Sequence, residues 1–307
     1  QSYISLISCG QILQPRILWR PSRNIRKGNV DLVEYLENRG AGLGFMSSLA
    51  KRVITAVLLI PIILGCLYWG GLAFFVLVLA ASLVAMFELK VMLEEMNQPA
   101  PGVLLYASTA GILLAIYCQQ ELLLAPLMLL VFVLVAVKGL ISQDIQPFRR
   151  GGLALFTLFY GAFLPGHFLL LRSRPQGFAL LLMVLLGTWA ADTGAYFVGM
   201  RWGRHRLAPQ ISPKKSVEGA LGGLVLAALV TQYVNSQLQV VLVPGWLTGL
   251  VVGVAAAAGD LFESALKREA GVKDSGWILP GHGGVLDRID SLLFSVPVVY
   301  YLVRWLS

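Results

Sequence analysis

The chain contains nine long stretches of predominantly apolar sequence, and they constrain its fold more than any other feature. They are residues 53–70, 72–90, 102–118, 121–141, 152–171, 177–199, 219–235, 238–258 and 290–306. A helix needs about 20 apolar residues to cross the hydrocarbon core of a bilayer. Inside the bilayer the backbone must satisfy its own hydrogen bonds, which a helix does. The sequence therefore predicts an all-α, polytopic integral membrane protein with about nine transmembrane helices.

The composition argues against a single water-soluble core. Of the 307 residues, 57% are hydrophobic and 13% are charged, whereas a soluble domain carries about 25% charged residues. The net charge of +8 does not indicate nucleic acid as a partner, because the basic residues cluster at the ends of the apolar stretches. In that position they set topology and attract anionic lipid or phosphate.

Cysteine and histidine are too few and too scattered to build a metal site. The cysteines are Cys9, Cys66 and Cys118, of which two lie in apolar stretches and no two share a metal-ligand spacing. The histidines are His167, His205 and His282. We therefore predict neither a zinc site nor a disulfide framework.

Lysine and arginine predict the orientation of the helices. If residue 50 lies in the cytoplasm, the cytoplasmic connections are about 91–101, 142–151, 200–218 and 259–289. Their basic residues are Arg149, Arg150, Arg201, Arg204, Arg206, Lys214, Lys215, Lys267, Arg268, Lys273 and Arg288. The opposite side keeps Arg172, Arg174 and Arg304. This bias follows the positive-inside rule and predicts that both long polar connections face the cytoplasm.

Composition divides the chain into three parts. Residues 1–45 are polar, with basic residues from Arg16 to Lys27. They lack the apolar core and cleavage site of a signal peptide, so we predict an extension outside the working fold. Residues 46–186 are predicted to form the N-terminal transmembrane helices, and residues 187–307 the C-terminal transmembrane catalytic region.

Acidic residues concentrate in one short segment. Of the sixteen Asp and Glu residues, six fall between 260 and 290, namely Asp260, Glu263, Glu269, Asp274, Asp287 and Asp290. If the preceding apolar stretch continues as a helix, one face carries Asp260, Glu263, Ser264 and Lys267. Glycines from 271 onward end that helix, and a new helix opens near Asp287. This arrangement of helix, glycine-rich loop and helix can bring Asp260 opposite Asp287.

The paired carboxylates predict a metal site, because acids at membrane depth are costly unless a cation neutralises them. Oxygen ligands without histidine or cysteine select Mg²⁺ or a similar ion, which shares its shell with substrate phosphates. The neighbouring cations would hold phosphate oxygens, and they are Lys267, Arg268, Lys273 and Arg288. Backbone amides at the glycines 281, 283 and 284 can also approach an anion. Together these features predict phosphoryl or nucleotidyl transfer.

Other polar residues have two interpretations each. Glu263 and Asp290 are either metal ligands or ion-pair partners of nearby basic residues. Asp192 lies in an apolar stretch, where an acid is a candidate functional residue and here a further metal ligand. His282 is either a loop histidine bonded to the backbone or a phosphate donor and proton carrier. Glu88 ends an earlier stretch, where helix packing or capping is the simpler role.

Residues 264–290 form a long motif with many fixed positions. They read Ser264-Ala-Leu-Lys267-Arg268, four residues, Lys273-Asp274-Ser-Gly276, then Leu279-Pro280-Gly281-His282-Gly283-Gly284-Val285-Leu286-Asp287-Arg288-Ile289-Asp290. This segment resembles the signature of bacterial phosphatidate cytidylyltransferases (CDP-diacylglycerol synthases). Residues 192–196 and 212–219 also resemble that family, with Ser216 where many members have threonine. The resemblance is specific over 187–295 and general over 46–186.

The resemblance implies the transfer of a cytidylyl group from CTP to phosphatidic acid, giving CDP-diacylglycerol and pyrophosphate in phospholipid biosynthesis. It implies that Asp260 and Asp287 hold Mg²⁺, with a monovalent cation such as K⁺ beside it. The residues expected to act with them are Lys267, Arg268, His282 and Arg288. Those expected to bind substrate phosphate are Lys214, Lys215, Ser216, Ser264, Lys273, Gly283 and Gly284. For the two lysines before Ser216, a role in topology or at the lipid surface is the alternative.

The implied location is the bacterial inner (cytoplasmic) membrane, with the site facing the cytoplasm. Such a site must admit a nucleotide from water and a lipid head group from the bilayer, while the diacyl chains stay in hydrocarbon. The sequence does not determine the oligomeric state, and a homodimer is one arrangement that it allows.

Two other functions fit parts of the pattern. A membrane transporter would also have many spans and intramembrane acids, but here the acids concentrate in one loop and its flanking helix ends. A different lipid phosphotransferase, such as a polyprenol kinase, would keep a metal site but transfer a terminal phosphate. The products formed from CTP and phosphatidic acid separate the three functions.

Overall fold

The structure is a computed structural model that describes residues 53–98, 102–141, 147–240, 244–276, 278 and 283–306. Some of the sequence predictions lie outside these residues, among them the extension at 1–45, the role of His282 and the contact of the Gly281 amide with an anion.

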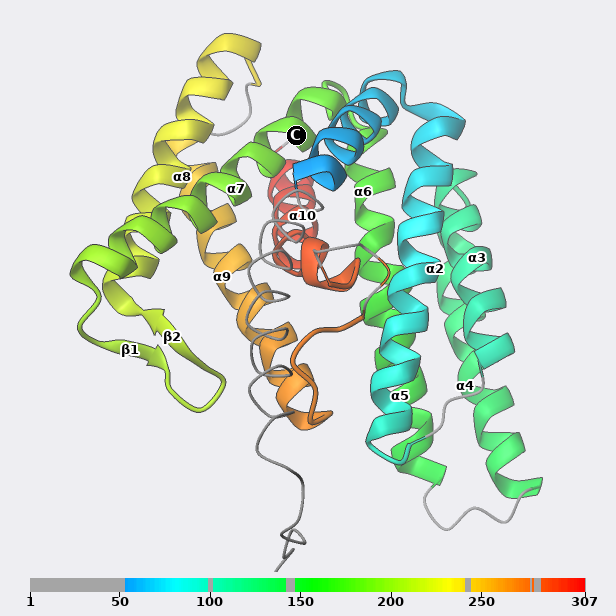
Figure 1. Cartoon of the computed structure of the whole chain (residues 1–307). Helices are drawn as coiled ribbons and strands as arrows, with labels where there is room; N and C mark the ends of the chain where they lie inside the picture. The colour runs from blue at the N-terminus through cyan, green and yellow to red at the C-terminus, as the bar shows by residue number, and fades with distance from the viewer. Residues whose placement is uncertain are drawn as a thin grey trace, which may run out of the picture. The chain divides into compact units, whose positions relative to one another are not determined.

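The described residues fold mainly into helices (Figure 1). A helix at Val53–Trp69 precedes α2 (Gly71–Glu95), α3 (Gly102–Tyr117), η1 (Glu121–Leu123), α4 (Leu124–Ile141), α5 (Pro147–Leu158), η2 (Phe159–Phe163) and α6 (Leu164–Arg172). The chain continues with α7 (Gly177–Trp202), β1 (Arg206–Ala208), β2 (Ser212–Ser216), α8 (Val217–Leu238), α9 (Gly245–Glu269) and α10 (Leu286–Leu306).

The predicted fold class is confirmed, since each of the nine apolar stretches coincides with a helix or with the α5–η2–α6 run. Within the described residues, six helices are long and apolar enough to cross a membrane, and three shorter apolar helices accompany them. The apolar stretch predicted at 238–258 begins later than expected, because α9 starts after Pro244. The helix continues to Glu269, as expected for the charged segment after residue 258. Pro244 cannot donate a backbone hydrogen bond and suits a helix start.

Glycines allow α7 and α8 to approach closely. A Cβ atom at Gly194 would lie 2.7 Å from the backbone oxygen of Gly222, and one at Gly199 would lie 3.2 Å from Ser216 Oγ. Gly194 and Gly199 therefore serve helix packing. Small residues let two membrane helices gain van der Waals contact where hydrophobic driving force is lacking.

A short antiparallel hairpin, β1–β2, interrupts the helices and was not predicted. Its register pairs Arg206 with Ser216. Ser216 Oγ accepts a hydrogen bond from the Gly219 backbone amide at 3.1 Å and caps the N-terminus of α8. Glu218 accepts hydrogen bonds from the backbone amides of Arg204 and His205 and pairs with the His205 ring at 2.6 Å. These bonds fix the connection between α7 and α8.

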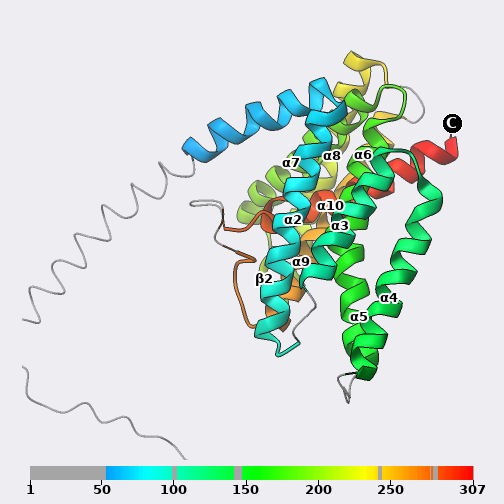
Figure 2. The same cartoon turned by 90° about the vertical axis from the view of Figure 1, so that its right-hand side faces the viewer.

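The helix ends that carry the polar connections gather at one end of the bundle. In both views the hairpin and the C-terminal ends of α2, α4 and α9 lie toward the lower end (Figures 1 and 2). The start of α10 lies farther up among the other helices (Figure 1). The segment after α9 therefore turns back into the bundle before α10 begins.

His167 is a packing residue. It is 1% exposed, its Nδ1 atom lies 2.9 Å from the Phe163 carbonyl oxygen, and its ring meets Tyr300 edge-on. The Tyr300 hydroxyl in turn accepts a hydrogen bond from Arg174 at 3.2 Å. This cluster joins α6 to α10.

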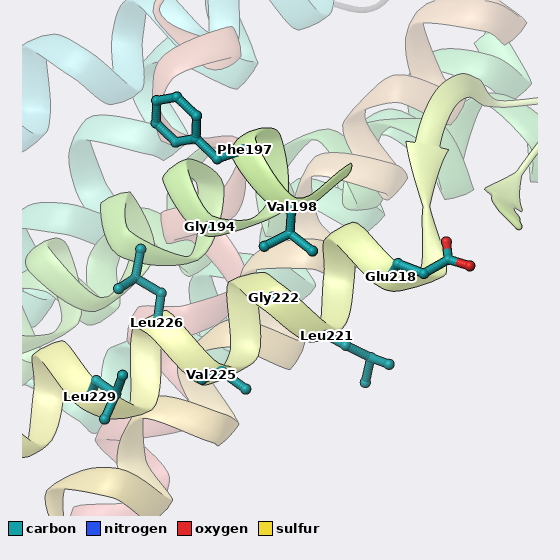
Figure 3. A pocket seen from close by; sticks show the side chains of 9 residues that line it. All are labelled: Gly194, Phe197, Val198, Glu218, Leu221, Gly222, Val225, Leu226 and Leu229. Carbon is teal, nitrogen blue, oxygen red and sulfur yellow. The ribbon is translucent and has the colours of Figure 1, made fainter. Parts of the chain in front are cut away.

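An apolar groove of about 510 Å³ runs between α7 and α8 (Figure 3). Its side chains include Phe197, Val198, Leu221 and Val225, and Glu218 lies at the end next to β2. Because Glu218 is engaged by the hairpin, this groove offers no free polar group among its lining residues. Most of the predicted site residues lie elsewhere, on α9 and α10 and in the segment between them.

Candidate active site

A carboxylate from α2 holds the start of α10. Glu88 is 1% exposed, and its two oxygens accept hydrogen bonds from the backbone amides of Val285 at 2.9 Å and Leu286 at 2.8 Å. Ser275 Oγ lies 3.1 Å from Oε2 of the same carboxylate. The first amides of a helix have no partner within the helix, and an anion there also suits the helix dipole. Glu88 is thus a capping residue supplied from nearly two hundred positions away.

Glycines after residue 275 make this contact sterically feasible. A Cβ atom at Gly276 would lie 2.6 Å from Glu88 Oε1, and one at Gly284 would lie 2.6 Å from Glu88 Oε2. No real Cβ atom tolerates such an approach. The glycines of the motif therefore let the loop close over the Glu88 carboxylate.

Asp287 is surrounded by donors. Its Oδ2 atom accepts hydrogen bonds from the backbone amides of Ser275 at 3.0 Å and Gly284 at 2.9 Å, and from Ser275 Oγ at 2.9 Å. Its Oδ1 atom pairs with Lys267 Nζ at 2.6 Å. We predicted that amides of the glycine loop approach an anion, and in the structure the Gly284 amide contacts the Asp287 carboxylate.

Lys267 joins α9 to α10 through two carboxylates. Its ammonium lies 2.5 Å from Glu263 Oε2 and 2.6 Å from Asp287 Oδ1. The Glu263 side chain is 0% exposed, and those of Lys267 and Asp287 are 13% and 6% exposed. A buried charge is retained only when it is paired and hydrogen-bonded. Glu88, Glu263 and Asp287, which all meet donors or an ammonium, are called the anchored acids below.

Asp260 lies one turn before Glu263 on α9 and is more open. Its Oδ2 atom pairs with Lys215 of β2, and Ser264 Oγ lies 3.4 Å from its Oδ1 atom. The Asp260 side chain is 34% exposed. The predicted phosphate-binding residues Lys215 and Ser264 therefore both contact a predicted metal ligand.

Asp192 and Asp290 complete a second acidic group around Asp260. Gly259 packs against the backbone of Asp290, where a Cβ atom would come 2.5 Å from the Asp290 carbonyl oxygen. The carboxylates of Asp192 and Asp260 both repel that of Asp290. Asp192 is exposed on α7. These three residues, from α7, α9 and α10, are called the outer acids below.

The remaining predicted site residues are either exposed or buried. Arg268 is exposed and donates to the carbonyl oxygens of Ile211 and Val272, each at 3.4 Å, so it ties α9 to the hairpin. Lys214, Lys273 and Arg288 are also exposed. Ser216 is 5% exposed and its hydroxyl serves as the α8 cap.

The structure brings α9 and α10 together as predicted, but it divides the two aspartates between the two groups. Asp287 is paired with Lys267, whereas Asp260 is paired with Lys215. Within the described part of the chain, no three Asp, Glu, His or Cys side chains converge closely enough to hold a metal ion by themselves.

Sequence reasoning gave Glu88 no place in the site. The available signal was a lone acid at the end of an apolar stretch, which is costly in a membrane unless it has a partner. Its partners are backbone amides of a loop far away in the sequence, and no pattern of side chains in the sequence identifies such partners. The interpretation as a cap was right, but the element that it caps could not be identified.

Comparison with known proteins identifies relatives across nearly the whole described region. A family model described as "Cytidylyltransferase family" matches residues 50–306. A phosphatidate cytidylyltransferase of Bacillus subtilis (strain 168) is 36% identical over 275 residues, covering 85% of this chain and 100% of the relative. One from Staphylococcus aureus (strain COL) is 34% identical over 266 residues, covering 82% and 98%. One from Synechocystis sp. is 40% identical over 181 residues, covering 49% and 61%.

Proposed function

The chain belongs to the cytidylyltransferase family, and from this premise we propose that it is a phosphatidate cytidylyltransferase. It joins CTP and phosphatidic acid and releases CDP-diacylglycerol and pyrophosphate. The observation that carries the assignment is the similarity to phosphatidate cytidylyltransferases over more than four fifths of the chain, and the match to the family model spans the motif at 264–290. The groups of anchored and outer acids supply the place for the reaction.

The reaction needs no nucleophile from the protein. A phosphate oxygen of the lipid attacks the α-phosphorus of CTP, the new P–O bond forms, and the bond to the β-phosphate breaks with pyrophosphate as the leaving group. The lipid phosphate is already ionised, so a strong general base is not required. The protein's part is to position two polyanions and to neutralise their charge.

The charged residues of the site suit this task. Lys215 contacts Asp260 and stands at the outer acids. Further cations for a triphosphate are exposed around the same helix ends: Lys214, Arg268, Lys273 and Arg288. Lys267 is held between two buried carboxylates, so we assign it to orienting Asp287 rather than to binding the triphosphate. His282 stays a predicted phosphate donor.

The outer acids fit a hard divalent cation such as Mg²⁺. They offer carboxylate oxygens that repel one another, with Lys215 as the ammonium that pairs with Asp260. Mg²⁺ typically takes one or two carboxylates and completes its shell with water and substrate phosphates. We assign it to Asp260 with Asp290 and Asp192, because the Asp287 oxygens are occupied by Lys267, Ser275 and Gly284. When bound, the ion neutralises triphosphate charge and stabilises the leaving pyrophosphate.

The family resemblance also implies a monovalent cation, and we keep K⁺ as a prediction. At fixed Mg²⁺, turnover in KCl should exceed turnover in NaCl at the same ionic strength. Equal rates in the two salts would remove K⁺ from the proposal.

The site has to face the cytoplasm, where CTP is found, and the relatives named above are bacterial. We therefore propose that the protein lies in the inner membrane, with the hairpin and the C-terminal ends of α2, α4 and α9 on the cytoplasmic side. Phosphatidic acid would enter laterally and keep its acyl chains in hydrocarbon. A homodimer remains a prediction, which the mass of the detergent-solubilised protein would test.

Purified protein assayed with labelled CTP and phosphatidic acid tests the function. The expected products are a lipid-linked CMP and pyrophosphate in equal amounts. Free CDP with a phosphorylated lipid would instead identify a kinase, and no reaction in folded protein would favour transport. Either result would overturn the assignment.

A further inference from the structure

Tyr160 lies in η2, a single π-helical turn between α5 and α6 (Phe159–Phe163). The turn packs against α2, since a Cβ atom at Gly161 would lie 3.1 Å from Met86 and 3.2 Å from Leu89. Turns of this kind give up regular helical hydrogen bonding and occur frequently at functional sites. The Tyr160 side chain in this turn is therefore a candidate for a role in the reaction.

The Tyr160 ring enters the contact between α9 and α10. Its centroid lies 5.5 Å from that of Phe262 on α9. It belongs to an apolar cluster with Leu286 and Leu293 of α10, and Leu266 of α9 packs against the same cluster. These neighbours flank Glu263 on α9 and Asp290 on α10. The ring thus lies beside the helix faces that carry the acids.

The Tyr160 hydroxyl has no hydrogen-bond partner among the described residues, although the side chain is 1% exposed. The carboxylates that interact with it are those of Glu263, then Asp290 and Asp260. Glu263 Oε1 is also buried without a hydrogen bond to any described residue. An unmade hydrogen bond on a buried hydroxyl costs about 1–3 kcal/mol. Phenylalanine would avoid that cost, so packing alone does not account for tyrosine at this position.

The Tyr160 hydroxyl and Glu263 Oε1 are a buried donor and a buried acceptor at the same contact of α9 and α10, and neither has a hydrogen-bond partner among the described residues, which indicates an intervening water. A buried water needs two to four polar partners, and a polar contact beyond 3.5 Å is frequently bridged in this way. The Tyr160 hydroxyl can donate to such a water, and the water can donate to Glu263 Oε1. Both groups would then be satisfied without moving either helix.

We propose that Tyr160 is a positioning residue of the active site, whose hydroxyl holds the free oxygen of Glu263 through one buried water. This inference rests on the proposed cytidylyl transfer. Glu263 holds Lys267, and Lys267 holds Asp287 at the start of α10. The bridge adds a second contact to Glu263, at the carboxylate oxygen that does not meet Lys267. Asp290 lies on the same helix, so its place among the outer acids depends on that orientation.

The substitution Tyr160→Phe separates this role from a structural one, because it removes only the hydroxyl. We expect kcat to fall about 10-fold, at the lower end of the 10- to 100-fold effects of changes around a metal site. The KM values for CTP and phosphatidic acid should stay unchanged, because neither substrate touches the hydroxyl. The melting temperature of the purified full chain without Mg²⁺ should change little, because the bridging water keeps its bond to Glu263 and loses one of its hydrogen bonds.

Tyr300→Phe is the matched control. Tyr300 is 2% exposed in the same bundle, but its hydroxyl accepts a hydrogen bond from Arg174 at 3.2 Å. Removing it should lower the melting temperature and leave kcat unchanged. The two tyrosines should therefore show opposite patterns in the two measurements.

A double substitution tests whether Tyr160 acts through Glu263. In a Glu263→Gln background, Tyr160→Phe should have no further effect on kcat, because coupled residues are not additive. Wild-type kcat in Tyr160→Phe, an additive double mutant, or a loss of stability matching the loss of kcat would each overturn the proposal. If the wild-type protein itself makes no CDP-diacylglycerol, the proposed function fails instead. The two failures are thereby distinguished.

Discussion

The two groups of acids share α9 and α10 but differ in what neutralises them. The anchored acids are buried and meet an ammonium, a hydroxyl and backbone amides. The outer acids lie on three helices, repel one another and meet Lys215 through Asp260. One α-helical turn of α9, from Asp260 to Glu263, separates the two environments.

The two groups therefore have different roles. Where donors or an ammonium meet the carboxylates, the charge holds the loop and α10 in place. Where carboxylates repel one another, folding is opposed until a cation arrives, so a site of this kind is kept for binding rather than for stability. Substitutions in the two groups should therefore differ in their effects on two measured quantities, the free energy of unfolding and kcat.

The largest effect on stability is expected at Lys267, which serves two of the anchored acids. Lys267→Met leaves Glu263 and Asp287 as unpaired buried charges. Removing one partner of a buried ion pair costs about 3–5 kcal/mol, a large part of the 5–15 kcal/mol that stabilises a typical protein. Denaturant unfolding in detergent, monitored by tryptophan fluorescence, measures the loss.

The exposed Lys273 is the control for Lys267. Lys273→Met should stay within about 0.5 kcal/mol of the wild-type protein, as surface substitutions usually do. Adding Glu263→Leu to Lys267→Met should recover part of the lost stability, because one unpaired charge is then gone. Wild-type stability in Lys267→Met would show that the anchored acids are not held by this ammonium, and the comparison between the groups would lose its basis.

The next effect falls on kcat and concerns the outer acids. Asp260→Asn removes one of the predicted cation ligands, so kcat should fall by more than about 100-fold, or about 2.7 kcal/mol in barrier height. Unfolding should be little changed, because the lost pair with Lys215 is partly exposed and such pairs contribute about 0–1 kcal/mol. Steady-state rates and thermal melts of the same preparation provide both numbers.

Glu269→Gln, at the exposed end of the same helix, is the control for Asp260 and should leave both measurements unchanged. Asp287→Asn should differ from Asp260→Asn, since it lowers kcat and stability together. Turnover at the wild-type rate in Asp260→Asn would remove the cation from the outer acids.

Much of this arrangement could be predicted from the sequence. The lengths of the apolar stretches predicted the helices, because a bilayer leaves the backbone few other ways to satisfy its hydrogen bonds. Helical spacing placed Asp260, Glu263 and Lys267 on one face, and the Glu263–Lys267 ion pair at 2.5 Å agrees with that spacing. The glycine-rich segment was correctly predicted to end α9 and to lead into a helix at Asp287.

The pairing between helices could not be predicted in the same way. Spacing within a helix says which residues share a face but not which partner that face meets, so Asp287 was placed opposite Asp260 although it pairs with Lys267. The hairpin was missed because its strands are three and five residues long. Tyr160 and Glu88 lie on helices with no motif, and their roles depend on contacts with α9 and α10.

The smallest of the three effects concerns Glu88, an anchored acid that lies outside the motif. Glu88→Gln keeps the size of the side chain and one acceptor oxygen, but it turns an amide group toward a backbone N–H. One buried donor of the α10 start then lacks an acceptor, which costs about 1–3 kcal/mol. Thermal and denaturant unfolding should both report this loss, and kcat should fall less than in Asp260→Asn.

Glu94→Gln provides the matched control for Glu88, because it makes the same change on the same helix. Glu94 is exposed and pairs with Lys90 at 2.6 Å across one helical turn, and such a pair contributes about 0.3–0.5 kcal/mol. If both substitutions cost the same, the Glu88 carboxylate does not hold α10, and the start of that helix must be fixed by the Asp287 contacts alone. If Glu88→Gln costs several times more, a residue from the N-terminal half of the chain fixes the helix on which both acid groups depend.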